Sequence, residues 1–376
     1  MPLSGRNARP CRCRGDGPTI RDARASALGP ARMACRSSLG RVQNGLMDAE
    51  VALQRLKECG VPIESLALYG RWWQLEVWLR QLAYLVLRSA WGVTWETELH
   101  KKATSYSAND DLGHLVGPDQ PDLLGYLDFS LLLALLEDNW GFFEPFLLKH
   151  IVWAGRAAEM RAIRNRVGHV RRTGSHDRGR VEQLLSDLEP GYRTALGTLA
   201  SSPLNGRWAS DPVVADYTKG TLGAACEHLR RKYRFDVDLS VSQMPWAQLP
   251  SASLNLSNTP GILWHLEIGG PDRFVHPGRL ASTIQPVRDH VVYVFAGTYF
   301  GAQLSVPAVD DSKDVLKTLT FFVQQFGSCT VAVDRISKEE LQAWPRLSAD
   351  LDSRVLVEHL FATAPSAATP GSIFGV

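Results

Sequence analysis

IESLALYGRWWQLEVWLRQLAYLVLRSA, residues 63–90, carries apolar side chains at every third or fourth position, which predicts one long helix. One apolar face comprises Trp72, Leu75, Leu79, Leu82 and Val86, and a second comprises Trp73, Val77, Tyr84 and Trp91. A helix with two apolar faces is buried on two sides. We expect one side to face the domain core. The other faces either a second subunit or the rest of a monomeric bundle.

Helical patterns without strand signals extend on both sides of this segment. Helices are expected over residues 48–58, 123–138, 144–168 and 178–188, the last closed by Pro190. A polar stretch over 100–120 predicts a loop. Residues 47–190 are therefore predicted to form an all-helical bundle. A connector over 191–235 contains one more helix, over 221–233.

The pattern changes after residue 235, where polar and apolar residues begin to alternate. Strands are expected over residues 235–242, 262–268, 291–296 and 330–333, with helices over 312–326 and from Ser337 onward. The predicted fold class is α+β and multidomain, with a helical bundle followed by a small α/β domain over residues 236–362. The tail, 363–376, is rich in Ala, Pro, Ser and Gly and is predicted to be disordered.

Charge is distributed unevenly along the chain. Residues 1–46 hold nine Arg and two Asp, whereas the remaining residues hold 32 basic and 37 acidic side chains. This leader is predicted to be disordered, with an organellar transit peptide as the alternative. The body is mildly acidic, so any affinity for nucleic acid must come from a local basic patch.

Cysteine usage and hydropathy predict a cytoplasmic protein. Three of the six cysteines lie in the leader and the other three are widely spaced, which is not a disulfide framework and indicates reduced thiols. The longest apolar run, residues 123–136, is broken by Asp128 and is too short to span a bilayer. No membrane partner is expected.

A local basic patch occurs between residues 156 and 180, which contain eight Arg against Glu159 and Asp177. Arginine suits bidentate contacts with phosphate. A solvated, arginine-rich helix end, favoured by the helix dipole, is the alternative. If the patch binds RNA, the contacting residues are expected to be Arg161, Arg166, Arg171, Arg172 and His176.

Within this patch the order Arg164-Asn165-Arg166-Val167-Gly168-His169 combines a permanent cation, an amide and a titratable imidazole. Such a set can cleave RNA without a metal. On a regular helix Asn165 and His169 share a face, but Arg164 and His169 diverge by about 140°. A bent helix end, or two copies packed across a dimer, would bring them together on one phosphate.

The helical context and the Arg-Asn-x-x-x-His order resemble the HEPN superfamily over residues 63–190. The segment from Tyr69 to Arg80 also resembles the opening helix of its Swt1-type branch. The resemblance implies a metal-independent, cofactor-free endoribonuclease that acts as a homodimer. It also implies a setting in toxin–antitoxin, phage-defence or RNA-processing systems, with an antitoxin or regulatory partner.

Carried over by the resemblance, the catalytic residues are Arg164, Asn165 and His169. The ribose 2′-OH would attack the adjacent phosphate and leave a 2′,3′-cyclic phosphate. His169 would act as general base or acid, Arg164 would stabilise the phosphorane, and Asn165 would orient either group. Some members of the superfamily have no catalytic activity. The alternative is therefore a non-catalytic dimerisation or RNA-binding module with a C-terminal sensor domain.

A third hypothesis places chemistry in the C-terminal region. His265 and Glu267 fall on one face of a predicted strand, and His276 and His290 follow nearby. Their spacing matches no metal motif, so satisfied histidines on a polar strand face are the favoured interpretation. The tryptophans over 72–95 lie at helical spacing beside Leu and Val and are predicted to be core.

Overall fold

The computed structural model describes residues 51–99, 103, 123–200, 202–204, 206–250, 255–296, 301–337 and 354–357. The chain divides into two units, residues 1–61 and 62–376. In the first unit, residues 51–58 are helical, as predicted. The leader, the tail, the predicted helix after Ser337 and, except for residue 103, the predicted loop over 100–120 lie outside the described residues.

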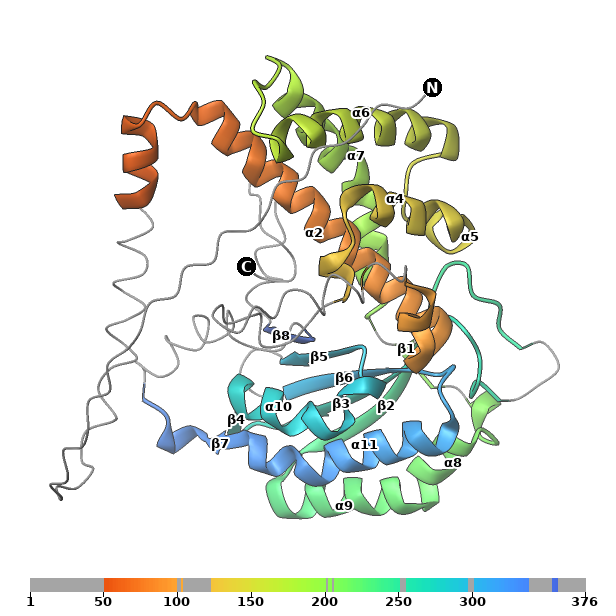
Figure 1. Cartoon of the computed structure of the whole chain (residues 1–376). Helices are drawn as coiled ribbons and strands as arrows, with labels where there is room; N and C mark the ends of the chain where they lie inside the picture. Colours follow the sequence, from red (N-terminus) through yellow and green to blue (C-terminus); the bar gives the residue numbers. More distant parts are fainter. Residues whose placement is uncertain are drawn as a thin grey trace, which may run out of the picture. The chain divides into compact units, whose positions relative to one another are not determined.

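The second unit is built around α2 (Ile63–Trp91), which contacts three other helices of the bundle (Figure 1). All five residues of its predicted first face are buried. Trp72 packs edge-on against Phe129 of α4 with ring centroids 4.6 Å apart, and Trp78 stacks on Tyr192 of α7 at 4.8 Å. The prediction of a long core helix is confirmed, and these tryptophans are core residues.

The second face of α2 changes its surroundings along the helix. Trp73, in the N-terminal half, is 39% exposed, so the prediction that it belongs to the core was wrong. Further along, the Tyr84 hydroxyl donates to the carbonyl oxygens of Val291 and Val292 at 3.3 and 3.1 Å. Trp91 packs against Phe142. The C-terminal half is therefore covered within one chain, as the monomeric alternative expects, while dimerisation stays a prediction.

Some of the other bundle helices begin or end at positions different from those predicted. They are η2 (Leu123–Tyr126), α4 (Phe129–Asp138), α5 (Trp140–Phe143), α6 (His150–Gly168) and α7 (Asp177–Gly197). Asp128 splits the predicted 123–138 helix, because its carboxylate accepts the N–H groups of Ser130 and Leu131 and so caps α4. The predicted start of α6 at Glu144 was wrong. Buried Phe143 and Phe146 anchor a turn there.

Pro190 does not end α7, contrary to prediction. Proline inside a helix costs about 3 kcal/mol relative to alanine. Beyond it the helix buries Tyr192 and Ala195, which offsets that cost. Gly191 lies so close to the bundle that a methyl group there would overlap the Phe146 carbonyl. Tertiary packing therefore overrides the local signal.

The rest of the unit is a mixed region of helices and strands. A six-stranded sheet has the order β1-β2-β3-β6-β5-β8, antiparallel except for the parallel β5–β8 pair. Its strands are β1 (Ser202–Pro203), β2 (Asp236–Gln243), β3 (Ile262–Gly269), β5 (Tyr293–Ala296), β6 (Gly301–Pro307) and β8 (Val355–Val357). A second, two-stranded sheet pairs β4 (Arg273–Val275) with β7 (Thr330–Ala332). The fold class is mixed α+β, with helices predominating among the described elements.

The helices of this region include two that match the predicted bounds, α9 (Thr221–Tyr233) and α11 (Ser312–Phe326). Two short ones were missed, α8 (Pro212–Lys219) and α10 (Pro277–Ile284). The Asp211-Pro212 pair is a cap followed by a first-turn proline, a signal that could have revealed α8. Short 3₁₀ turns complete the region: η1 (Gly92–Glu98), η3 (Gly206–Trp208), η4 (Gln285–His290), η5 (Gly327–Cys329) and η6 (Val333–Arg335).

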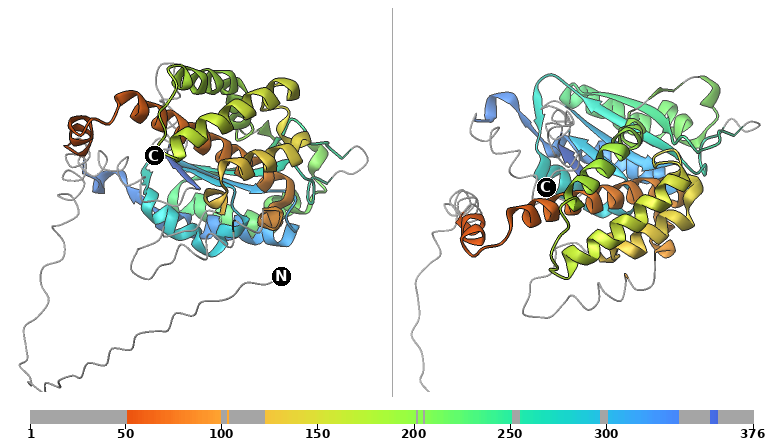
Figure 2. Two further views of the ribbon diagram at one scale, coloured as in Figure 1. Left: turned by 45° about the horizontal axis from the view of Figure 1, so that its top comes forward. Right: turned by 90° about the horizontal axis from the view of Figure 1, so that it is seen from above.

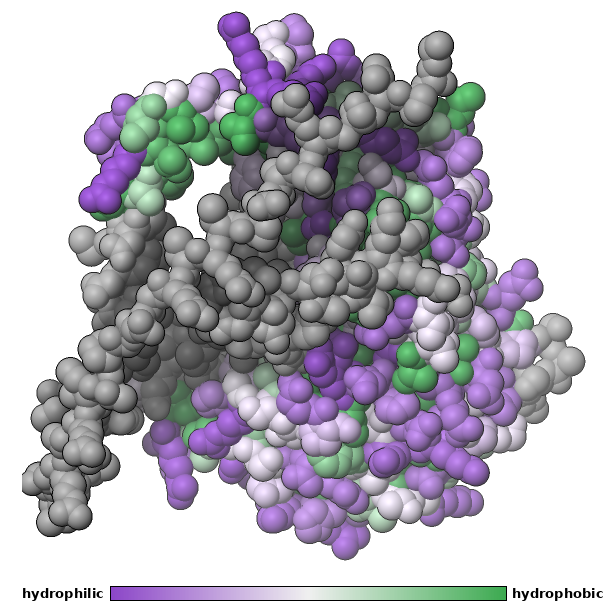
Figure 3. All heavy atoms as spheres, viewed as in Figure 1, coloured by the Kyte–Doolittle hydropathy of each residue, from purple (hydrophilic) through white to green (hydrophobic). Residues whose placement is uncertain are grey.

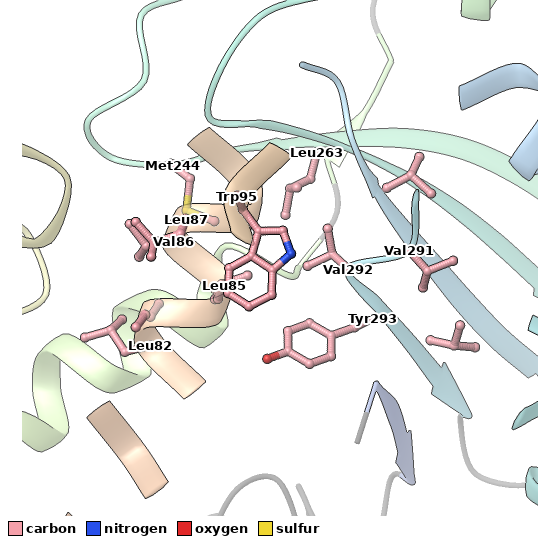
Figure 4. Packing of buried hydrophobic residues seen from close by; sticks show 14 of the residues in the cluster. Leu82, Leu85, Val86, Leu87, Trp95, Met244, Leu263, Val291, Val292 and Tyr293 are labelled. Atoms are coloured by element: carbon pink, nitrogen blue, oxygen red, sulfur yellow. The ribbon is translucent and has the colours of Figure 1, made fainter. Parts of the chain in front are cut away.

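The sheet lies between two layers of helices, with α2 on one side and α9 and α11 on the other (Figures 1 and 2). Figure 4 shows the α2 side, where Leu82, Val86 and Trp95 meet Leu263 and Tyr293. This face also carries Ser240, His265 and Ser305, which pair across β2, β3 and β6. The opposite face carries apolar residues such as Leu239, Leu266 and Leu304, all buried. Among the described helices, none has the length and apolarity needed to cross a bilayer.

Candidate functional site

The Arg164–His169 motif occupies the last turn of α6. Met160 and Ile163 are fully buried and hold this end of the helix against the bundle. Arg164 is half-buried, whereas Asn165 and His169 are exposed. The structure therefore places the three predicted catalytic residues at one helix end, on the solvent side.

The helix ends at Gly168, as predicted, but the left-handed residue that reverses the chain is Val170. Its N–H donates to the Val167 carbonyl at 3.1 Å, and the Arg171 N–H donates to the Arg166 carbonyl at 2.8 Å. This pair of bonds is a Schellman motif, in which the left-handed position is usually glycine. Val170 has a φ of +51° there. His169 becomes the C-terminal cap and leaves the helical path.

The Arg164 side chain extends toward the same helix end. A methyl group placed on Gly168 would lie 3.6 Å from Nη1 of Arg164 and 3.7 Å from its Cζ. The guanidinium therefore lies over Gly168, the residue that precedes His169. Completion of the site by a second copy stays a prediction.

Most arginines of the basic patch are paired with carboxylates. Arg161 lies 3.5 Å from Glu137, and Arg166 lies 2.5 Å from Asp177. The remaining pairs join Arg156 to Glu159 and Asp187, Arg178 to Glu64 and Glu182, and Arg180 to Glu159. Arg164, Arg171 and Arg172 have no ion-pair partner among the described residues. The unpaired positive charge is therefore concentrated at the C-terminal end of α6 and in the following turn.

The positive charge of these three arginines opposes the electric field of the helix C-terminus. The C-terminus of a helix carries a partial negative charge that attracts arginine and repels phosphate. The Schellman bonds occupy the Arg166 and Val167 carbonyls. Three unpaired guanidiniums nearby exceed the half-charge of the dipole, so this end of the helix can attract an anion. Figure 3 shows hydrophilic side chains gathered over this end of α6 and the start of α7, at the top of the view.

An ion pair holds the turn between α6 and α7. Asp177 is buried and accepts from Arg166 through Oδ1 and from the Gly174 N–H through Oδ2 at 2.8 Å. Burial alone would raise the pKa of Asp177, but these two hydrogen bonds outweigh it and hold the pKa below 3.8. A methyl group on Gly174 would lie 2.9 Å from the carboxylate, so a larger residue there would displace Asp177. Arg166, a predicted RNA ligand, therefore fixes the turn that carries His169 and His176.

A shallow polar groove of about 500 Å³ lies beside this turn. His176, also a predicted RNA ligand, lines it together with Ser175, and Glu64 lines it from α2. Arg156, Arg178 and Arg180 line it too, but carboxylates already neutralise them. The groove is therefore less cationic than its arginine content suggests.

The C-terminal histidines do not gather in one place. His265 is fully buried, with Nε2 2.6 Å from Ser242 Oγ and Nδ1 2.8 Å from Ser305 Oγ. His276 caps α10, and His290 lies 3.2 Å from Asp310. Burial lowers the pKa of His265 from 6.5 to about 3, so its ring is neutral. In the part of the chain that the structure describes, no group of three or more His, Cys, Asp or Glu could hold a metal ion.

These positions confirm the interpretation of His265 as a satisfied histidine on a polar strand face. Glu267 shares that face, as predicted, because it follows His265 by two residues on β3.

Comparison of the chain with protein-family models found no match, and comparisons with curated proteins and with solved structures found none either. The geometry of the α6 end is therefore the main indication of function.

Proposed function

We propose that this protein is a metal-independent endoribonuclease of the HEPN type. One helix end brings together exposed Asn165, exposed His169 and Arg164, which has no ion-pair partner in the described part of the chain, and this observation carries the proposal. Arg171 and Arg172, which have no ion-pair partner among the described residues, lie in the adjoining turn and could hold RNA. Arg166 supports the proposal indirectly, because its bond to Asp177 fixes that turn.

The proposed reaction is transesterification within the RNA strand. A general base removes the proton of a ribose 2′-OH, and the 2′ oxygen attacks the adjacent phosphorus. The bond from phosphorus to the 5′ oxygen breaks, and that oxygen takes a proton from a general acid. The products are a 2′,3′-cyclic phosphate and a free 5′-OH.

Each residue of the motif has a role in this scheme. His169 moves a proton, a step worth about 10²–10⁴ in rate. Arg164 stabilises the charge that develops on the phosphorane. Asn165 orients the imidazole or the phosphate. A second copy of the chain would supply the complementary acid or base from its own motif.

Cleavage of labelled RNA by the purified full chain tests the proposal. We expect products with 2′,3′-cyclic phosphate ends, activity that persists in excess EDTA, and no cleavage of DNA of the same sequence, which lacks the 2′-OH. The Arg164→Ala/His169→Ala double variant should be inactive. His228→Ala, which changes an exposed histidine on α9, is the matched control and should cleave like wild type. Equal cleavage by wild type and the double variant would overturn the proposal.

The same experiment separates the non-catalytic alternative. Arg171 and Arg172 are unpaired but have no role in the chemistry, so they favour RNA binding in either case. If the protein binds a labelled RNA but leaves it intact, it is an RNA-binding module. Growth after induced expression adds a cellular readout. A toxic nuclease arrests growth, and the double variant does not.

A further inference from the structure

Val170 combines two unfavourable features at the tip of the α6–α7 turn. Its side chain is 95% exposed, the highest value among the exposed large apolar residues described. Its φ of +51° lies in the left-handed region, where a β-branched side chain is strained. Glycine adopts this conformation without strain and is the usual residue at this position of a Schellman motif.

The fold of the chain itself does not require the valine side chain. The two hydrogen bonds that close the helix end, from Val170 and from Arg171, are made by backbone N–H groups. Glycine would form both bonds at lower conformational cost. Strained backbone conformations cluster at active sites and ligand-binding sites, so the strain at Val170 indicates a contact outside the folded chain.

The surroundings of Val170 indicate the chemistry of that contact. His169 precedes it, and Arg171 and Arg172 follow it, all exposed. Neither arginine has an ion-pair partner among the described residues. An apolar side chain set between cations matches a ligand that alternates apolar surface with negative charge. Single-stranded RNA has this character, because its unpaired bases are separated by phosphates.

We propose that Val170 packs against an unpaired base of the RNA, while Arg171 and Arg172 hold the phosphates beside it. The inference rests on the proposed function and adds a substrate class to it. Bases in an A-form duplex are stacked and hidden from such a contact. The site therefore selects single-stranded over double-stranded RNA.

Binding to a 2′-O-methylated, fluorescein-labelled 20-nucleotide RNA, which lacks the attacking hydroxyl, tests the contact without cleavage. Val170→Ala removes most of the side chain, and Val170→Gly also relieves the strain. We expect both to weaken binding about fivefold, the loss of roughly one buried apolar contact. Val170→Gly should also raise the Tm by ~1–3 °C. Ile151→Ala, at the other end of α6 and 85% exposed, is the matched control and should bind like wild type.

Salt dependence separates the base contact from the phosphate contacts. The Arg171→Ala/Arg172→Ala double variant should lower the slope of log K against log salt by about 1.4, since each phosphate contact to a single strand contributes about 0.7. Val170→Ala should lower the affinity without changing the slope. The complementary duplex should bind wild type and Val170→Ala equally.

The outcomes distinguish this inference from the proposed function. Wild-type affinity in Val170→Ala, or an equal loss in Ile151→Ala, overturns the base contact while cleavage still supports the nuclease. A Val170→Ala protein that binds normally but changes from dimer to monomer by light scattering would show that the side chain contacts a second copy. RNA binding that depends on Val170 without cleavage would sustain the inference and refute the nuclease. A wild type that binds no RNA refutes both.

Discussion

Two histidines in this protein, His169 and His265, occupy opposite environments. His169 is exposed at a helix end, where the Arg164 guanidinium lies over the preceding residue, Gly168. His265 is fully buried in the sheet and has a serine hydroxyl at each ring nitrogen. The comparison shows that burial and existing partners, rather than residue type, decide whether a histidine is available for chemistry. The buried ring stays neutral, and the exposed one keeps access to solvent and to a substrate.

The two sites also differ in how their backbone is arranged. The His265 region is a regular antiparallel ladder, with Ser240 and Ser305 opposite the histidine on its neighbours. The His169 region contains a left-handed valine and a turn fixed by one ion pair. Strain and unpaired charge therefore occur together at the α6 end, which is the pattern expected of a functional site.

The largest predicted effect is on catalysis at the exposed histidine. His169→Ala should lower the RNA cleavage rate by about 10²–10⁴-fold, because the proton-transfer step loses its catalyst. Its Tm should stay within ~1 °C of wild type, since an exposed side chain contributes little to stability. Single-turnover cleavage and calorimetry on the same preparations measure both. Unchanged cleavage by His169→Ala would show that His169 is not a catalytic residue.

The buried histidine should show the reverse behaviour. His265→Ala leaves the Ser242 and Ser305 hydroxyls without their partner and opens a cavity, so we expect a loss of about 2–4 kcal/mol in the free energy of unfolding. Urea unfolding at pH 7.5 measures it. RNA cleavage, assayed below the temperature at which the variant unfolds, should match wild type. A stable His265→Ala protein that has lost cleavage would support the C-terminal catalytic hypothesis.

A smaller effect is expected at the ion pair that holds the α6–α7 turn. Asp177→Asn weakens the bond to Arg166, and we expect about 1–3 kcal/mol of destabilisation at pH 7. The pKa of Asp177 is lowered by folding, so its stabilising effect is full above the unfolded value near 3.8 and disappears as the pH falls through the lower folded value. The Tm difference from wild type should therefore vanish in strong acid. Asp187→Asn, on α7 and paired with Arg156, is the control.

A pH dependence of stability is also expected from His265. Its pKa is about 3 in the folded protein and 6.5 in the unfolded chain. The free energy of unfolding is highest above pH 6.5 and falls between pH 6.5 and 3, because the unfolded chain takes up a proton that the folded protein excludes. The loss should approach about 1.4 kcal/mol per pH unit. His265→Gln should flatten this part of the curve, whereas His228→Gln should leave it unchanged.

Several features of the fold were predictable because their signals are local. The apolar period of residues 63–90 defines α2, and the ends of α9 and α11 follow from their helical pattern. The motif at Arg164, Asn165 and His169 could be located at the end of a helix by its composition alone. Local sequence also predicted the polar strand face that carries His265 and Glu267.

Tertiary structure decided what the local signals could not. Arg166 and Arg171 look alike in sequence, but only Arg166 has a buried carboxylate within reach, 11 residues away. Pro190 would end a solitary helix, yet packing against α2 and Phe146 continues α7 beyond it. His265 finds its hydroxyl partners 23 and 40 residues away. The sequence by itself therefore determined which residues form helices and where the motif lies, because those depend on neighbours within a few positions. Which charges stay unpaired, and which histidine stays accessible, depended on contacts between distant segments that only the folded chain brings together.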